Sequence, residues 1–306
     1  MTFSSQVKDE LCRIRNEGSL FELCELYGIL LFSKSFKKEN ISVFTENQQV
    51  ARFIEELIIK NFGFILDIIV SDRRIKKHNF LIKIVCSKDR EFILNKFGHN
   101  AKDLNLTINK KYITEPIDLR SVFLRGVFLS CGTISNPNKD YHIEFCVQYM
   151  NLAKCLIELI ESIVELRVTP CLVNRRGKFI VYIKGSESIT DFLTYIGATS
   201  SAMDVIQIKM IKEVRNYVNR TTNFETANLK KTTSAAATQI QAINLLKKSG
   251  AFNSLDEDLK ELAELRLHNP DMSLKTLGEN LSYPLSRSGV NHKLKKIISY
   301  ANYKEG

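Results

Sequence analysis

The sequence of 306 residues predicts an α+β protein made of two similar halves, followed by an all-helical domain. Three observations support this fold class. Helical segments alternate with short strand-like runs over residues 1–203. Motifs in this region recur at a spacing of roughly 100 residues, which is typical of an internal repeat. The remaining part of the chain has only helical periodicity.

The repeat is clearest in an apolar, glycine-containing segment near the start of each half. Leu26–Leu31 reads Leu-Tyr-Gly-Ile-Leu-Leu, and Leu124–Leu129 reads Leu-Arg-Gly-Val-Phe-Leu. Val50–Ile58 matches Leu152–Ile160 in the same way. Apolar residues in these four segments recur at helical spacing, so each half is expected to contain two long helices.

Strands are predicted where β-branched and aromatic residues cluster beside turn residues. Ile41–Phe44 is one such run, and Tyr141–Phe145 is another, with polar and apolar residues alternating. Val168–Val173 and Phe179–Ile183 are predicted to form a hairpin around the polar turn Asn174–Lys178.

The strand Phe80–Ile84 in the first half corresponds to Phe179–Ile183 in the second. We therefore expect two αββαββα units, at about residues 1–100 and 101–203, related by a pseudo-twofold axis. Together they form the predicted first domain, 1–203.

Residues 204–233 are predicted to be a helical and polar linker. Asp204–Val214 has helical periodicity, whereas Asn216–Thr233 is rich in Asn and Thr and poor in apolar residues. The second of these segments is expected to be a polar linker that connects the two domains.

The second domain, 234–306, is predicted to contain only helices. Breaks are expected at Gly250, Pro270 and Pro284 because these residues interrupt helices. The four expected helices are Ser234–Lys248, Leu255–His268, Ser273–Leu281 and Ser286–Tyr300.

The last two of these helices fit a helix-turn-helix. Ser273 is placed to cap the first helix, and Leu274, Leu277 and Leu281 share one face of it. Pro284 ends that helix, and Ser286 or Ser288 can cap the next one. The buried stripe of the final helix is expected to consist of Val290, Leu294, Ile297 and Ile298.

The opposite face of the final helix carries residue types that bind DNA. In a helix-turn-helix the N-terminal part of the second helix enters the major groove. We expect Arg287, Ser288, Asn291 and His292 to contact bases, with Ser286 at the start of the same surface. We expect Lys293, Lys295 and Lys296 to hold phosphates. Gly289 is unusual inside a helix, and a close backbone approach to DNA or to the preceding helix would explain it.

The charge distribution agrees with a polyanionic partner. The formal net charge is +10 and the pI is about 9.2. Residues 286–306 hold five basic residues and one acidic residue. Positive charge concentrated on one short segment is the electrostatic pattern expected of a protein that binds nucleic acid.

Other classes of function have little support in the sequence. The seven cysteines include no CxxC pair, so we expect reduced, buried thiols and neither disulfides nor a zinc site. The sequence has no GxxxxGK[ST] or GxGxxG motif, and no cofactor or metal is expected. The start of the chain does not resemble a signal peptide, and no apolar run is long enough to span a membrane. These features favour a cytoplasmic protein associated with the nucleoid.

The two glycine-containing segments, Leu26–Lys34 and Leu124–Gly132, resemble the LAGLIDADG signature of homing endonucleases. The resemblance implies two helices packed along a pseudo-twofold axis, each ending in an acidic residue that holds a divalent metal. Ser33 and Cys131 stand at these acidic positions, and neither carries a carboxylate. The resemblance therefore implies a degenerate site without nuclease activity, because the catalytic metal needs these ligands.

The order of these parts resembles the WhiA family of bacterial DNA-binding regulators over essentially the whole chain. The most specific stretches are Val218–Lys230 and Leu285–Ile297. The resemblance implies a regulator of sporulation, or of cell division and chromosome segregation, in Gram-positive bacteria. It also implies a terminal domain like the promoter-reading domain (region 4) of sigma factors, which provides most of the DNA contact.

Three hypotheses of function follow. The leading one is a sequence-specific, non-enzymatic regulator of transcription that binds double-stranded DNA. The second is an adaptor that docks a sigma factor or RNA polymerase through the first domain, and both can hold together. The third is an active endonuclease, which the residues Ser33 and Cys131 argue against. Since the repeat already supplies an internal pseudo-dimer, we expect a monomer.

Overall fold

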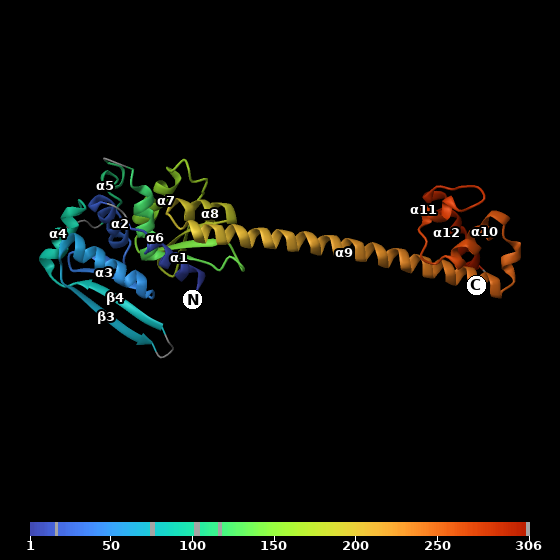
Figure 1. Ribbon diagram of the computed structural model, residues 1–306, viewed down its shortest axis with the longest axis horizontal. Coiled ribbons are helices and arrows are strands. Elements are labelled where there is room, and N and C mark those ends of the chain that lie inside the picture. The colour runs from blue at the N-terminus through green and yellow to red at the C-terminus, as the bar shows by residue number, and fades with distance from the viewer. Residues whose placement is uncertain (16–17, 74–76, 101–104, 116–117, 304–306) are drawn as a thin grey trace. The chain divides into compact units, whose positions relative to one another are not determined.

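The computed structural model describes residues 1–15, 18–73, 77–100, 105–115 and 118–303 (Figure 1). Its chain divides into two compact units, 1–212 and 213–306. The first unit is α+β and the second is helical, which confirms the predicted fold class.

The first unit begins with α1 (Phe3–Leu11) and then contains the same succession of elements twice. The first copy consists of α2 (Ser19–Leu31), β1 (Ser35–Lys37), β2 (Asn40–Thr45), α3 (Gln48–Phe62), β3 (Leu66–Arg73), β4 (Lys77–Ile84) and α4 (Ser87–Lys96). After the short α5 (Lys111–Thr114), the second copy consists of α6 (Arg120–Cys131), β5 (Gly132–Ile134), β6 (His142–Val147), α7 (Met150–Glu161), β7 (Cys171–Arg175), β8 (Lys178–Lys184) and α8 (Ser186–Tyr195).

The two sheets have the same topology, which confirms the predicted αββαββα repeat. Their antiparallel strand orders are β1-β2-β4-β3 and β5-β6-β8-β7. The register pairs Phe44 with Leu81 in the first sheet and Phe145 with Val181 in the second. The predicted hairpin is present, but its first strand begins at Cys171, three residues later than Val168.

Helices α2 and α6 pack side by side at the centre of the first unit (Figure 1). Gly28 and Gly126 make this packing possible. A Cβ atom on Gly28 would lie 2.4 Å from the carbonyl oxygen of Phe123, and one on Gly126 would lie 2.1 Å from that of Glu25. Neither distance is sterically allowed, so only glycine permits the two helix backbones to approach this closely.

A cluster of aromatic rings packs against the α2–α6 pair. The Tyr27 ring stacks on Phe97 with 4.7 Å between centroids and contacts Phe123 at 5.3 Å. Its hydroxyl lies 2.9 Å from Nε2 of His99 and accepts a hydrogen bond from the Asn109 amide at the same distance. Burial raises the pKa of Tyr27 well above its usual range. The buried Tyr27 hydroxyl therefore has two hydrogen-bond partners, which offset the free-energy cost of removing it from water.

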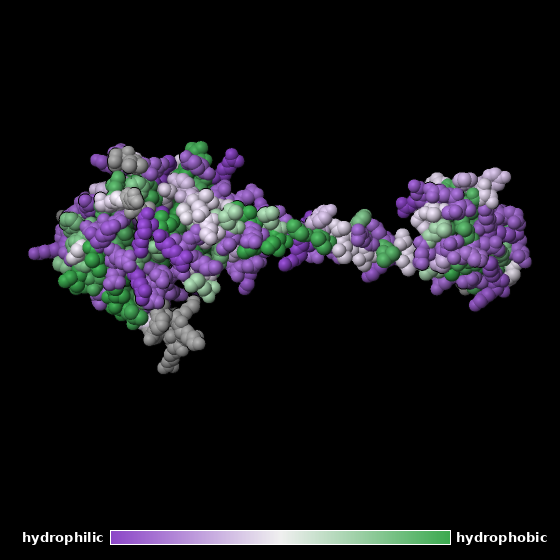
Figure 2. Space-filling view, viewed as in Figure 1, coloured by the Kyte–Doolittle hydropathy of each residue, from purple (hydrophilic) through white to green (hydrophobic). Residues whose placement is uncertain are grey.

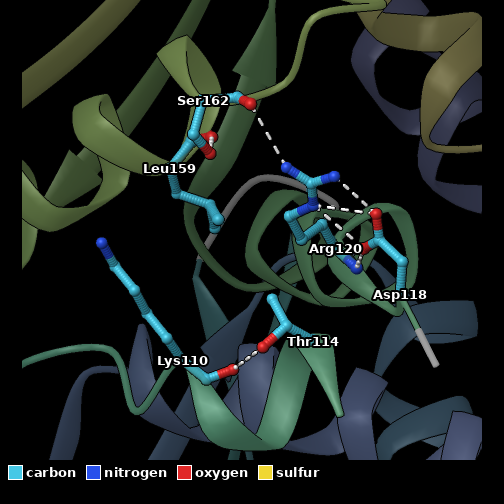
Figure 3. A network of polar contacts seen from close by, with 6 residues as sticks. All are labelled: Lys110, Thr114, Asp118, Arg120, Leu159 and Ser162. Atoms are coloured by element: carbon cyan, nitrogen blue, oxygen red, sulfur yellow. Dashed lines mark hydrogen bonds and ion pairs between the residues drawn. The ribbon is translucent and has the colours of Figure 1, made fainter. Parts of the chain in front are cut away.

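The start of α6 is fixed by a polar network (Figure 3). The Asp118 carboxylate accepts hydrogen bonds from the Arg120 amide at 3.0 Å and from its guanidinium at 2.6–3.0 Å. These side-chain hydrogen bonds lower the pKa of Asp118. Arg120 also donates to the carbonyl oxygen of Ser162, which directly follows α7. The network therefore joins the two main helices of the second copy.

Helix α9 (Thr199–Lys248) differs from the sequence-based prediction. Asn216–Thr233 is predicted to be a polar linker before a helix that begins at Ser234, but α9 runs through this segment and is continuous over 50 residues. The segment contains neither Gly nor Pro, and each Asn or Thr costs only about 0.5 kcal/mol relative to Ala. The Thr232 hydroxyl donates to the carbonyl oxygens of Asn228 and Leu229 within the same helix. Polar composition alone therefore does not end this helix.

The second unit has its own core. After α9 the chain forms a 3-10 turn (Ala251–Ser254), α10 (Glu257–His268), α11 (Leu274–Glu279) and α12 (Arg287–Tyr303). The fully buried residues include Ile243 of α9, Leu262 of α10, Leu277 of α11, and Val290 and Ile297 of α12. These helices pack their predicted apolar faces together.

Candidate nucleic-acid interface

The candidate interface is the face of α12 opposite its buried stripe. Val290, Leu294 and Ile297 are buried, as predicted, and Ile298 packs half-buried against the same core. The core residues recur at spacings of three and four, so residues between them face away from the core. The geometry leaves one side of α12 available to a ligand.

Helix α11 and the following turn hold α12 in place. The Ser273 hydroxyl accepts a hydrogen bond from the Thr276 amide at 3.2 Å, which confirms the predicted cap. The Leu285 amide donates to the carbonyl oxygen of Gly278 at 3.0 Å, and a Cβ atom on Gly278 would lie 2.2 Å from the Leu285 oxygen. The chain therefore folds tightly back over Gly278 before α12 begins.

The start of α12 has a hydroxyl cap. Ser286 Oγ accepts a hydrogen bond from the Gly289 amide at 3.2 Å, and it lies 2.9 Å from Ser288 Oγ. Of the two serines predicted as possible caps, Ser286 takes this role. Its hydroxyl is exposed and remains on the predicted DNA-binding surface.

A second polar contact fixes the turn against α10. The Glu261 carboxylate accepts hydrogen bonds from the amide and the hydroxyl of Ser282, both at 2.7 Å. These hydrogen bonds lower the pKa of Glu261. Fixing the turn on two sides limits how far α12 can move relative to α11.

The residues predicted to contact bases lie together on α12. Arg287, Ser288 and His292 are exposed, and Asn291 is half-buried. Lys295 is exposed and lies one turn after Asn291. The structure brings these side chains onto the surface away from the core, and their contacts with DNA stay a prediction.

Two of the predicted phosphate ligands have partners within the protein. Lys293 forms an ion pair with Asp258, and Lys296 forms one with Asp256 at 3.3 Å between Nζ and Oδ2. The hydrogen bond to Asp256 raises the pKa of Lys296, and the hydrogen bond from Lys293 lowers the pKa of Asp258. Both acidic residues lie at the start of α10. Sequence reasoning missed these pairs because the partners are more than thirty residues away.

Gly289 has room for a methyl group within the protein. The nearest atom to an added Cβ is Ser286 Oγ at 3.5 Å, an ordinary contact distance. A close approach of the preceding helix therefore does not explain this glycine. A close approach to DNA stays a prediction.

The degenerate metal-binding positions lie at the ends of α2 and α6. Ser33 is buried, and its hydroxyl donates to the carbonyl oxygen of Ser35 at 3.0 Å. Cys131 is the last residue of α6, and burial raises the pKa of its thiol to about 12. Neither side chain is an anionic ligand at neutral pH, so the donor set does not fit a divalent cation.

A lysine from α1 approaches the same region. Lys8 Nζ donates to the carbonyl oxygen of Leu129, on the last turn of α6, at 3.2 Å. The side chain is half-buried, and burial lowers the pKa of its amine to about 8. Lys8, Ser33 and Cys131 line a groove of about 1050 Å³ in which Glu46 is the only carboxylate among the described lining residues. A cationic amine beside these positions further opposes metal binding.

The seven cysteines are free, but they are not all buried as expected. Cys86 and Cys171 are exposed. Cys86 follows the end of β4, and Cys171 is the first residue of β7. At such strand ends, apolar neighbours in the sequence do not ensure that a side chain is buried. Across the described ranges, no cluster of three His, Cys, Asp or Glu side chains has the geometry to hold a metal. None of the helices in those ranges is long and apolar enough to cross a bilayer.

Two family models match the chain. The WhiA C-terminal HTH domain matches residues 218–301, and the WhiA LAGLIDADG-like domain matches residues 120–215. The helix-turn-helix described above lies within the first match except for the last two residues of α12, and the second αββαββα copy lies within the second match.

Curated relatives match over nearly the whole chain. The chain is 36% identical over 318 residues to the probable cell division protein WhiA of Alkaliphilus metalliredigens, covering 100% of this chain and 99% of that protein. It is 38% identical over 314 residues to the protein of the same name from Clostridium beijerinckii, covering 98% of both. Among solved structures, full-length DUF199/WhiA from Thermatoga maritima matches with a TM-score of 0.58 and 25% identity over 99% of both chains.

Proposed function

Because the chain belongs to the WhiA family, we propose that it is a sequence-specific regulator of transcription that binds double-stranded DNA through α12. The observation that supports this proposal is the face of α12 away from the core, where exposed Arg287 and Lys295 lie on either side of half-buried Asn291. The turn before α12 is hydrogen-bonded to Glu261 of α10. Arg and Asn form bidentate hydrogen bonds with guanine and adenine, and Lys binds phosphate.

The biological setting of the proposal is cell division. Relatives that match nearly the whole chain are named probable cell division proteins. We extend this role to chromosome segregation and sporulation, with the protein acting on the nucleoid in the cytoplasm. A contact with sigma factor or RNA polymerase through the first unit belongs to the same proposal.

We further propose that the protein does not cleave DNA. Ser33 and Cys131 provide no carboxylate, and the Lys8 amine lies in the same groove. Phosphodiester hydrolysis in two-metal sites requires cations that stabilise the attacking and leaving oxygens. Incubation of the full chain with bound DNA and Mg²⁺ or Mn²⁺ should leave the DNA intact, and repeated turnover would contradict this part of the proposal.

The experiment that tests the regulatory role is the mapping of bound chromosomal sites in cells. The full chain is crosslinked and precipitated, and the recovered DNA is sequenced alongside transcripts from a deletion strain. We expect discrete sites that share a sequence and lie upstream of genes whose transcripts change. Uniform recovery of DNA across the chromosome would contradict sequence-specific regulation.

A further inference from the structure

The middle of α9 is a long exposed segment. Every residue from 213 to 235 is exposed to solvent. The two ends of the helix are packed: Val205 belongs to the core of the first unit and Ile243 to that of the second. The side chains of residues 213–235 are not packed against either core, so packing within the protein does not explain their residue types.

Hydrophilic and hydrophobic residues are both exposed along α9 (Figure 2). By helical spacing, the residues of the middle segment divide between two faces of the helix. One face is polar apart from Ala227, and its polar residues recur at spacings of three or four. They are Asn216, Asn219, Arg220, Asn223, Thr226 and Lys230. The opposite face carries exposed apolar side chains, including Val214 and Val218. Glu225 lies two residues after Asn223 and therefore points away from the polar face, which contains no carboxylate from Asn216 to Lys230. Glu213 lies one turn before Asn216 on the same side of the helix.

The polar face has the chemistry of a nucleic-acid contact. Arg220 and Lys230 supply the charge that binds phosphates, and Asn side chains pair with the N6 and N7 atoms of adenine. A solvated helix without a ligand would be stabilised by acidic partners spaced four residues from the basic ones. The polar face has no such partners, so a polyanion is the ligand that its side chains fit.

The dimensions also agree with double-stranded DNA. The major groove is about 12 Å wide and admits an α-helix. At 1.5 Å per residue, residues 216–230 span roughly 20 Å, somewhat more than half of a DNA turn of about 34 Å. This segment lies largely within the match to the WhiA C-terminal HTH domain, which begins at residue 218.

We propose that the polar face of α9, from Asn216 to Lys230, is a second contact surface for double-stranded DNA, beside the one on α12. This inference rests on the proposed function. Arg220 and Lys230 hold phosphates, and Asn219 and Asn223 contact base edges. The surface adds affinity and extends the length of DNA that each chain recognises.

The test measures DNA affinity of the full chain by fluorescence anisotropy at several salt concentrations. The DNA is a duplex taken from a mapped site. The test variant is Arg220→Ala with Lys230→Ala, because alanine favours the helix. We expect Kd to rise about tenfold and the log–log salt slope to fall by about 2, since each phosphate contact contributes about 0.9.

A matched control removes two positive charges elsewhere. Lys88→Ala with Lys96→Ala changes exposed residues of α4, and we expect its Kd and salt slope to equal those of the unchanged protein. Circular dichroism should show equal helicity for both variants. A third variant, Asn219→Ala with Asn223→Ala, should reduce the preference for the mapped sequence over an unrelated duplex several-fold.

The outcomes separate this inference from the proposed function. Unchanged Kd and slope for the α9 variant, with weakened binding by Lys295→Ala on α12, would overturn the α9 contact and leave the regulator intact. Equal losses in the α9 variant and the α4 control would also overturn it, because the effect would then be general electrostatic attraction. Unchanged binding by both the α9 and α12 variants would contradict the proposed function itself.

Discussion

Arg125 of α6 and Glu25 of α2 form a bidentate ion pair between the two central helices of the repeat. Nε lies 2.8 Å from Oε1, Nη2 lies 3.2 Å from Oε2, and the two side chains are 6% and 1% exposed. The pair crosses between the two copies of the repeat, so it joins the halves at their interface. Buried guanidinium and carboxylate groups need such partners because desolvation of each charge is unfavourable.

The ion pair predicts a specific pattern of stability. Glu25→Ala should lower the free energy of unfolding by about 3–5 kcal/mol because it leaves the Arg125 charge buried without its carboxylate partner. Replacing both residues, Glu25→Leu with Arg125→Met, should restore most of that loss. Urea unfolding of the three proteins measures the difference. A double variant as unstable as Glu25→Ala would contradict the expectation.

Gly126→Ala should destabilise the first unit by about 2–3 kcal/mol because the added Cβ would lie 2.1 Å from the Glu25 oxygen and force α2 and α6 apart. Gly28→Ala should act similarly. Urea unfolding measures both effects. The contrary outcome is a change below about 0.5 kcal/mol, as is usual for a surface substitution.

Gly289→Ala also replaces a glycine inside a helix, but unlike Gly126→Ala it is expected to increase the stability of the protein. The protein has room for the methyl group, so α12 should gain roughly 0.5–1 kcal/mol. DNA affinity should fall about tenfold if the α12 backbone approaches DNA at this position, as we predict. Thermal unfolding and anisotropy measure the two quantities. Unchanged affinity would show that the backbone does not approach DNA here.

Lys8 predicts a dependence of stability on pH. Burial lowers the pKa of its amine to about 8, below that of an unfolded lysine near 10.5. Between these values the unfolded chain binds the extra proton, so the contribution of Lys8 to stability rises with pH. Relative to Lys8→Met, the unchanged protein should gain roughly 2 kcal/mol from pH 7 to pH 10. Urea unfolding at both pH values measures this, and a constant difference would contradict it.

The repeat was predictable from sequence because both copies keep the same order of apolar runs and turns. Phe80–Ile84 and Phe179–Ile183 lie in equivalent central strands, β4 and β8, as the matched motifs predict. The close approach at Gly28 and Gly126 also followed, since glycine removes the Cβ atoms between two helices. These features depend on short sequence patterns, so one sequence is sufficient to predict them.

The parts that sequence did not predict depend on long-range contacts or on small energies. Glu25 and Arg125 are separated by 100 residues, and Lys293 pairs with Asp258 over 35 residues, so spacing gives no hint of either pair. The helical state of Asn216–Thr233 depends on small propensity differences that a polar composition obscures. On α12 the predicted surface residues do lie away from the core. Lys293 and Lys296 form ion pairs with acidic residues at the start of α10, so Lys295 is the predicted phosphate ligand on α12 that has no such ion pair.

The most direct test of the central claim is the DNA affinity of the full chain after changes on the exposed face of α12. Anisotropy with a duplex from a mapped site compares the unchanged protein with Asn291→Ala, Lys295→Ala and the control Lys275→Ala on α11. We expect Asn291→Ala to cost about 1–3 kcal/mol for the mapped sequence and little for an unrelated duplex. Lys295→Ala should weaken binding to both duplexes and lower the salt slope by about 1. Equal affinities for all four proteins would contradict DNA recognition by α12.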